Sequence, residues 1–183
     1  MRLLIAYGTT DGHTRIIANR IAEWVLSNGF DADVMDTASV PDGLAVTDYD
    51  AYVLAGSLHM SEHQASLVHF VKDNVSAMRK RPSALVSSSL TAVIHDEKHM
   101  KDAQDCIDTF TKQTGLRPTV ATPVAGALQY TKYDWMKRML MKKISQKEGG
   151  DTDTTRDFEY TDWDALKKFV EGFLATISVR ATA

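Results

Sequence analysis

Several residue types are scarce in this chain, and each scarcity narrows what the protein can be. The 183 residues include one cysteine, Cys106, so no internal disulfide can form and no paired-thiolate metal site can be built. Acidic and basic residues nearly balance, 24 against 21, and the net charge of -3 is too small for a disordered acidic tail or a general nucleic-acid binder. We therefore expect a cytoplasmic protein that does not bind nucleic acid.

Long apolar runs are also missing. The first run, residues 3–7, stops at Gly8, which is too short for the core of a signal peptide and far below the roughly 20 residues of a membrane helix. We expect neither export nor a membrane span. With 44% apolar residues over 183 positions, the chain suits one globular domain with a single core, residues 1–183.

Strand and helix patterns alternate along the chain. Strand patterns occupy residues 3–7, 30–35, 52–56, 84–90 and 120–128. Helical spacing of apolar residues fills residues 14–26, 64–78, 98–114 and 161–177. Because parallel strands need long, right-handed crossovers, this order predicts an α/β fold, a doubly wound five-stranded parallel sheet in a three-layer sandwich.

A long segment, residues 129–158, separates the fifth strand from the last helix, where a few residues are usual. Its first part, residues 130–147, mixes aromatic and aliphatic residues with six basic residues, and Asp134 is the only acid. Wound as a helix, it would have an apolar face opposite a basic one. This pattern is typical of a helix in a membrane interface, but also of a helix packed on the domain with a solvated basic side. We describe 129–158 as a basic amphipathic insertion.

The loop between the first strand and the first helix, residues 9–14, reads TTDGHT. It gathers hydroxyls, a glycine and backbone N–H groups at a helix N-terminus, where the dipole and the unpaired donors favour an anion. The loop lacks the lysine of triphosphate-binding loops and the three-glycine spacing of dinucleotide-binding loops, so a phosphate monoester is preferred over ATP or NAD. An ordinary capped turn is the alternative interpretation.

The same loop resembles the FMN phosphate loop of flavodoxins. Four further motifs, GSLH (56–59), VAGALQY (124–130), GGDTDT (149–154) and YTDW (160–163), resemble the menaquinone-dependent protoporphyrinogen oxidases. That family is flavodoxin-like, contains FMN and carries a long insertion before its last helix. Asp11 departs from the usual flavodoxin loop, and we expect it to offer its backbone N–H and to face solvent, because its carboxylate would repel a phosphate.

In a doubly wound sheet, ligands bind beyond the carboxyl ends of the strands. The resemblance therefore implies that FMN is bound by three loops, with residues Thr9, Thr10, Asp11, Gly12, His13, Thr14, Ser57, Leu58, His59, Met60, Ser88, Ser89, Leu90, Thr91 and Ala92. The loops that would flank the flavin ring contain no aromatic residue other than histidine, so one face of the ring should be open. An open face favours an enzyme over an electron carrier.

Histidines offer one candidate for catalysis and two for metal binding. His59, beside the flavin, could donate to the ring or relay a proton, although a chance placement stays open among six histidines. His59 and His63 are four residues apart, as are His95 and His99, a spacing that zinc sites use on helices. No ordered carboxylate or thiolate set accompanies either pair, so we expect no metal.

The resemblance implies that electrons pass from protoporphyrinogen IX through the flavin to menaquinone or a related quinone, in heme biosynthesis at the cytoplasmic face of the cell membrane. The insertion would contact substrate or membrane through Tyr130, Tyr133, Trp135, Lys137, Arg138 and Lys142. Two alternatives stay open: a flavodoxin-type FMN electron carrier for protein partners, and an FMN quinone reductase with a different donor. The sequence also leaves open whether copies of the chain form a homo-oligomer.

Overall fold

A computed structural model describes residues 1–59, 61–90, 97–132, 141–143, 145–146 and 151–181. The strands are β1 (Arg2–Gly8), β2 (Asp31–Asp36), β3 (Ala51–His59), β4 (Glu62–His63), β5 (Ser83–Ser89), β6 (Val120–Ala125), β7 (Ala127–Leu128) and β8 (Phe158–Glu159). The long helices are α1 (His13–Ser27), α2 (Ala65–Met78), α3 (Glu97–Thr114) and α5 (Trp163–Ala181), with short 3-10 turns at Val46–Asp48 and Tyr130–Lys132.

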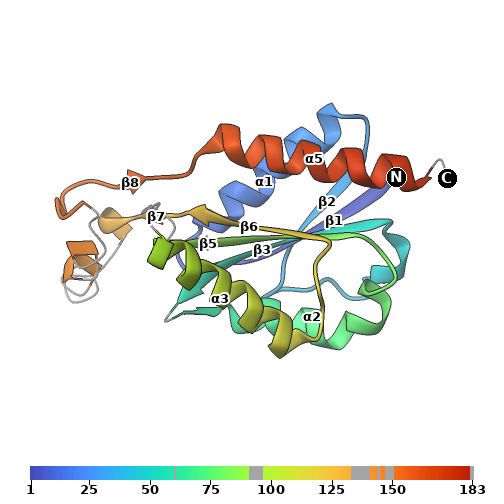
Figure 1. The fold of residues 1–183 in the computed structure, drawn as a ribbon, viewed down its shortest axis with the longest axis horizontal. Helices are drawn as coiled ribbons and strands as arrows, with labels where there is room; N and C mark the ends of the chain where they lie inside the picture. Colours follow the sequence, from blue (N-terminus) through green and yellow to red (C-terminus); the bar gives the residue numbers. More distant parts are fainter. Residues whose placement is uncertain (60, 91–96, 133–140, 144, 147–150, 182–183) are drawn as a thin grey trace.

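Five parallel strands form the sheet, in the order β2-β1-β3-β5-β6. Helices α1 and α5 cover one face and α2 and α3 cover the other, which gives three layers (Figure 1). The predicted doubly wound, five-stranded parallel sheet is confirmed.

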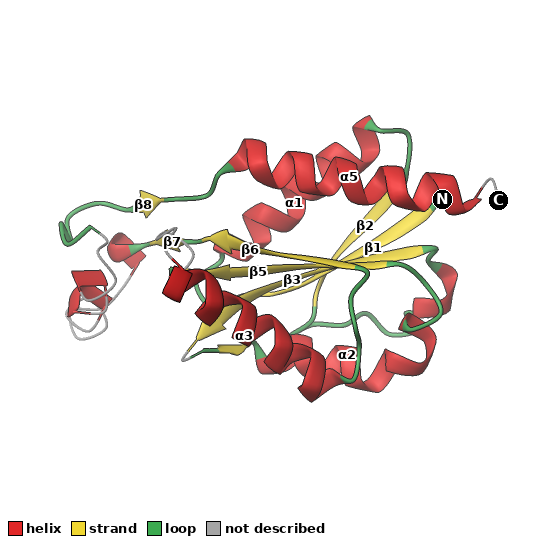
Figure 2. Ribbon diagram, in the orientation of Figure 1, coloured by secondary structure: helices red, strands yellow, loops and turns green. Residues whose placement is uncertain are grey.

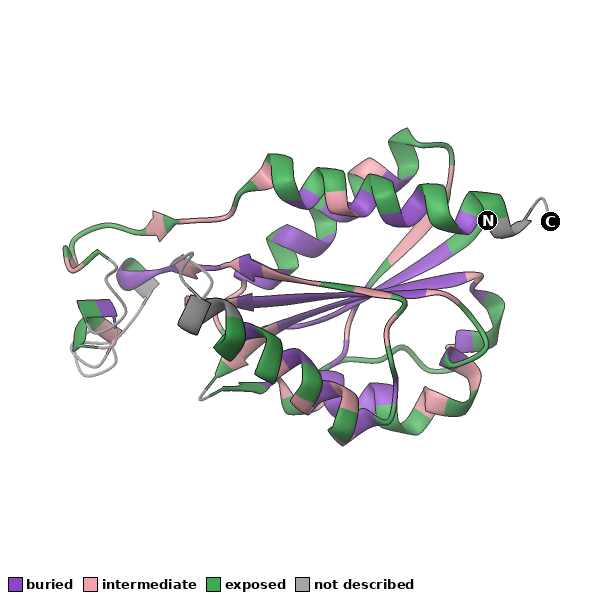
Figure 3. Cartoon of the chain, in the orientation of Figure 1, coloured by how far each residue is buried: buried purple, intermediate pink, exposed green. Residues whose placement is uncertain are grey.

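Burial on both faces explains why the strands read as short apolar runs. Successive residues of β1 point to opposite sides: Leu3 and Ile5 pack under α1 and α5, while Leu4 packs against α2 and α3. Figure 3 shows the sheet buried between its helical layers. Each fully buried aliphatic side chain of this kind stabilises the fold by about 1.5 to 3 kcal/mol.

The helix ends follow local signals in the sequence. Helix α1 stops at Asn28, and Gly29 follows with a φ of 80°, a left-handed conformation that glycine adopts without strain. Helix α5 is capped by Asp162, whose Oδ1 accepts the N–H of Ala165 at 2.9 Å.

The strand order reverses between β1 and β3, which are neighbours although β2 lies between them in the chain. A crevice beyond the carboxyl ends of the strands is expected at such a reversal. The sheet departs from prediction on this side: β6 ends at Ala125 rather than continuing to residue 128. The Gly126 N–H donates to Ser89 O at 2.9 Å, and the next two residues leave the sheet to pair with β8. Figure 2 shows the small β7–β8 ribbon beyond this end of the sheet.

Strand β3 is also longer than predicted. It continues past Gly56 to His59 and turns back as β4, with Leu58 opposite His63 and His59 opposite Glu62. Ser61, in the turn, has a φ of 65°. We had expected an irregular loop here, because residues 57–63 lack the alternation of apolar residues that marks a strand.

Candidate functional site

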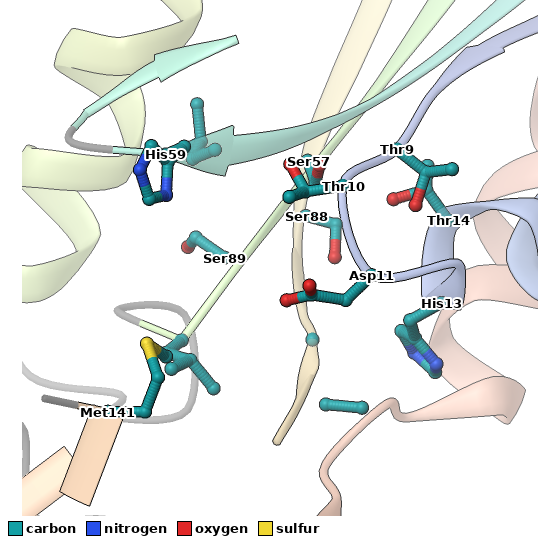
Figure 4. A pocket seen from close by; sticks show the side chains of 14 residues that line it. Thr9, Thr10, Asp11, His13, Thr14, Ser57, His59, Ser88, Ser89 and Met141 are labelled. Carbon is teal, nitrogen blue, oxygen red and sulfur yellow. The ribbon is translucent and has the colours of Figure 1, made fainter. Parts of the chain in front are cut away.

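Segments that are far apart in the sequence meet in one pocket at the strand reversal. They are the loop after β1, the carboxyl ends of β3 and β5, and the segment after β6 (Figure 4). The pocket is lined by Thr9, Thr10, Asp11, His13, Thr14, Ser57, Leu58, His59, Ser88, Ser89, Leu90, Gly126, Ala127 and Met141. The structure therefore brings together most of the described residues that we predicted as cofactor-binding, and Gly12 lies in the same loop.

The loop after β1 is a tight turn that leads into α1. The Thr9 hydroxyl oxygen accepts the Gly12 N–H at 2.9 Å, and Gly12 has a φ of 92°, where a side chain would be strained. Because Gly12 is the residue that precedes the helix, no side chain caps the first turn, and that turn contains no acidic residue. The first amides of α1 are thus placed to bind an anion.

His13, the first residue of α1, ties this loop to the start of α5. The Thr161 hydroxyl donates to Ala125 O at 2.9 Å, and the same oxygen lies 2.8 Å from His13 Nε2. A hydroxyl has one proton, so His13 Nε2 carries a proton and donates to Thr161. Glu159 Oε1 lies 3.8 Å from the same nitrogen, and the rings of His13 and Trp163 are 6.3 Å apart. The loop of residues 9–14 is therefore held by hydrogen bonds to the segment that follows the insertion.

Asp11 does not face away from the pocket as expected. It is half-buried, and its carboxylate points into the pocket beside Ser88 (Figure 4). Asp11 lies inside the turn that the Thr9–Gly12 hydrogen bond closes at the edge of the pocket.

Gln64 was missed as a site residue. It lies just before α2, and its side-chain nitrogen donates to Thr10 Oγ1 and to Ser57 Oγ. The sequence pattern placed Gln64 only at the start of a helix. Gly126, Ala127 and Met141 were missed as well. Gly126 and Ala127 were missed because the fifth strand was predicted to continue to residue 128, whereas β6 ends at Ala125.

The two histidines of the β3–β4 hairpin have different environments. His59 is exposed and lines the pocket, where Figure 4 shows it across from the loop of residues 9–14. His63 is 5% exposed, packs edge-on against Phe110 and forms a hydrogen bond with Ser87 Oγ at 3.0 Å. Burial lowers the pKa of His63 from 6.5 to about 4. Among the described residues, no cluster of three His, Cys, Asp or Glu side chains could hold a metal ion.

Buried His63 makes stability depend on pH. Its folded-state pKa of about 4 lies below the unfolded value of 6.5, so the unfolded chain binds the proton first as the pH falls. The stability that depends on neutral His63 is fully present above the unfolded-state pKa of 6.5, and it is lost as the pH falls toward the folded-state pKa of about 4. In His63→Gln, the loss in the free energy of unfolding between neutral and acidic pH should be smaller by about 3 kcal/mol than in the wild type. Urea unfolding at several pH values measures this difference. His69→Gln, an exposed position on α2, is the control and should keep the wild-type slope.

A small satellite core holds the two ends of the insertion together. Tyr130 is fully buried, its hydroxyl donates to Asp151 O at 2.9 Å, and its ring packs edge-on against Phe158. The same carbonyl oxygen accepts the hydroxyl of Ser145 at 2.7 Å, and the Tyr160 hydroxyl donates to Asp151 Oδ2 at 2.8 Å. The prediction that Tyr130 contacts substrate or membrane is therefore wrong, because its ring and hydroxyl are used inside this core.

The turn after Asp151 is closed by hydrogen bonds to the side chain of Asp153. Asp153 Oδ1 accepts the N–H of Thr155 at 3.0 Å and its hydroxyl at 2.6 Å, and these bonds lower the pKa of Asp153. Lys142 is exposed. The other predicted residues, Met60, Thr91, Ala92, Tyr133, Trp135, Lys137 and Arg138, lie outside the described residues. No helix of the described residues is long and apolar enough to cross a bilayer.

Known proteins resemble this chain in fold and, to a lesser degree, in sequence. A family model for the flavodoxin domain matches residues 4–155. Among solved structures, Flavodoxin 1 from Bacillus cereus has a TM-score of 0.57 at 14% identity, covering 96% of this chain and 98% of that one. A flavodoxin of Streptococcus pneumonia TIGR4 has a TM-score of 0.56 at 17% identity, covering 96% and 99%. These structures share the fold.

Curated relatives are more similar in sequence. A Leishmania major protein named protoporphyrinogen IX dehydrogenase (quinone) is 33% identical over 177 residues, 95% of this chain and 75% of the relative. An Escherichia coli K12 protein of the same name is 31% identical over 169 residues, 92% of each chain. The fold and the site define a protein of the flavodoxin class. Within that class, the chain belongs to the family of the protoporphyrinogen IX dehydrogenases, which are oxidoreductases.

Proposed function

We propose that this chain is an FMN-dependent dehydrogenase that takes electrons from protoporphyrinogen IX and passes them to menaquinone or a related quinone. The observation that carries the proposal is the pocket at the strand reversal, which offers hydroxyls and helix amides on one side and an open, non-aromatic wall on the other. The curated relatives support the substrate and acceptor classes through their names.

One side of the pocket fits a phosphate monoester. Thr9, Thr10 and Thr14 supply hydroxyls beside the uncapped N-terminus of α1, which together can hold the terminal phosphate of FMN. At the opposite side of the pocket, the backbone of Gly126 packs closely on Ser88, since an added Cβ at Gly126 would lie 3.2 Å from Ser88 Oγ.

The other side of the pocket suits a flavin that reacts with a small molecule. Bound FMN supplies hydride and single-electron transfer. None of the described lining residues is Trp, Tyr or Phe, so none of them would stack on the flavin as an aromatic plate. His59 stands exposed at this side, where it can take or give a proton at its imidazole.

An anaerobic assay tests the proposal. Purified protein loaded with FMN is mixed with protoporphyrinogen IX and a menaquinone analogue, and porphyrin fluorescence is followed. Porphyrin should form only with protein and quinone together, and His59→Gln should slow it without releasing FMN. Bound FMN with no porphyrin above the rate of free FMN would favour an electron carrier. Quinone reduction with another donor alone would favour a different reductase.

The charge of Asp11 should weaken the binding of FMN, because its carboxylate points into the pocket that would hold a phosphate dianion. Asp11→Asn should therefore tighten FMN binding by about 3- to 10-fold, and high salt should reduce the gain. Titration of apoprotein with FMN at two salt concentrations measures both effects. Asp31→Asn, exposed at the start of β2, serves as the control. Weaker binding in Asp11→Asn would contradict this expectation.

We also propose that the insertion carries the chain to the cytoplasmic face of the membrane, where the quinone is. The basic residues Lys137, Arg138 and Lys142 support this, and Lys142 is exposed. Changing all three to glutamine should weaken sedimentation with anionic liposomes by roughly 1 kcal/mol per residue, in a salt-sensitive way. Changing Lys72, Lys80 and Lys112 to glutamine is the control. Equal loss in both triple variants would indicate only general charge attraction.

A further inference from the structure

Gln64 lies behind two hydroxyls that line the pocket. Its amide nitrogen donates to Thr10 Oγ1, and also to Ser57 Oγ at 3.2 Å. Thr10 belongs to the loop after β1 and Ser57 to the end of β3, so one side chain joins both sides of the strand reversal. Gln64 itself is not among the described residues that line the pocket.

These two hydrogen bonds determine where the hydroxyl protons can go. An amide nitrogen has two protons to donate and does not accept, so each hydroxyl oxygen is the acceptor in its bond with Gln64. Within the part of the chain that the structure describes, neither hydroxyl has a protein acceptor for its own proton. Both hydroxyls line the pocket, so both protons are available to an acceptor bound there.

The position of Gln64 is fixed by close packing on β1. A Cβ added at Gly8, the last residue of β1, would lie 2.8 Å from the Gln64 Cβ and 3.1 Å from the Leu67 Cβ. The absence of a side chain at Gly8 is therefore what lets Gln64 approach the strand end. The Gln64 backbone is held as well, because its carbonyl oxygen accepts the N–H of Val68 at 3.1 Å.

We propose that Gln64 is a positioning residue for the phosphate of FMN, which it serves by keeping the Thr10 and Ser57 hydroxyls as donors into the pocket. The inference rests on the proposed FMN site. Hydrogen bonds to a charged acceptor are stronger than bonds between neutral groups, so two pre-oriented donors favour the phosphate over an uncharged group. A carboxylate at position 64 would do the opposite, because it would accept both hydroxyl protons and add a negative charge.

The test compares two substitutions and two ligands. Gln64→Glu keeps the shape of the side chain but reverses the hydrogen bonds, whereas Gln64→Leu removes them. Apoprotein is titrated with FMN and with riboflavin, which lacks the phosphate, and flavin fluorescence is measured. FMN affinity should fall about 10-fold in Gln64→Leu and about 100-fold in Gln64→Glu, while riboflavin affinity changes by about threefold or less. Gln113→Glu, near the C-terminal end of α3, is the control for added charge.

Several results would overturn the inference. One is Gln64→Glu binding FMN as tightly as the wild type, or more tightly than Gln64→Leu. Another is an equal loss for FMN and riboflavin, which would indicate a merely structural role. If Gln64→Glu does not fold, Gln64→Leu is measured alone and with Ser57→Ala, where its effect on FMN should shrink; unchanged additivity would contradict the proposal. A wild type that binds no FMN would instead overturn the proposed function itself.

Discussion

Gly56→Val should lower the free energy of unfolding by about 3 kcal/mol or more. Gly56 is the residue of β3 that pairs with both Gly8 and Ser87 at the strand reversal. Even a single Cβ there would lie 2.8 Å from His63 Cδ2 and 2.8 Å from Leu67 Cδ2. Both neighbours are buried, so they can move only by disturbing the hairpin and the packing of α2. Urea unfolding measures the loss.

Gly172→Ala gives the matched control. Gly172 lies in α5, is exposed, and an added Cβ would meet nothing within 4 Å. Alanine favours a helix over glycine, so this variant should gain about 0.5 to 1 kcal/mol. Opposite signs for the two variants would show that close approach, and not backbone freedom, requires glycine at position 56. A Gly56→Val protein as stable as the wild type would contradict the packing described here.

The sheet could be predicted from the sequence because burial on both faces leaves a strong local signal. Residues 3–7 and 52–56 are continuous apolar runs, and the structure places them side by side as the centre of the sheet. The β3–β4 hairpin has no such signal: its turn contains Ser61 at a φ of 65°, where glycine or asparagine would have marked it. The break between β6 and β7 was missed because β7 has two residues, too few to show a period.

The site was predictable to the extent that it follows strand ends. Thr9 follows β1, and Ser57 and Ser88 lie near the carboxyl ends of β3 and β5, so the topology of the parallel sheet brings them to one edge. Contacts that depend on side-chain direction were not predictable. Gln64 and His63 are adjacent in sequence, yet one amide reaches the hydroxyls of the pocket and one imidazole is buried beside Phe110.

Tyr130 shows most clearly what the composition of a segment cannot predict. Among the aromatic and basic residues of 130–147, it looks like part of an amphipathic surface helix, but the structure buries it completely. Its partners, Asp151 and Phe158, are 21 or more residues away in sequence. No periodic pattern links positions so far apart, so its burial could be seen only in the folded chain.

Tyr130→Ala should therefore open the satellite core, with little effect on the main sheet. The ring and hydroxyl of Tyr130 join Leu128, Phe158 and Asp151, and this cluster is separate from the two cores that flank the sheet. Loss of a buried aromatic residue costs about 3 kcal/mol or more, which corresponds to roughly 100-fold faster amide exchange in β7 and β8. Hydrogen exchange followed by mass spectrometry measures the exchange rates in β7 and β8, and urea unfolding measures the stability of the main sheet.

Tyr130→Phe separates the ring from the hydroxyl. It keeps the edge-on packing and loses one hydrogen bond to Asp151 O, which still accepts the Ser145 hydroxyl at 2.7 Å, so the local loss should be about 1 kcal/mol. Because Ala127 and Met141 border the pocket beside this core, Tyr130→Ala should retain FMN but slow porphyrin formation more than Tyr130→Phe does. Unchanged exchange in β7 and β8 of Tyr130→Ala would mean that the insertion is held by contacts other than this core.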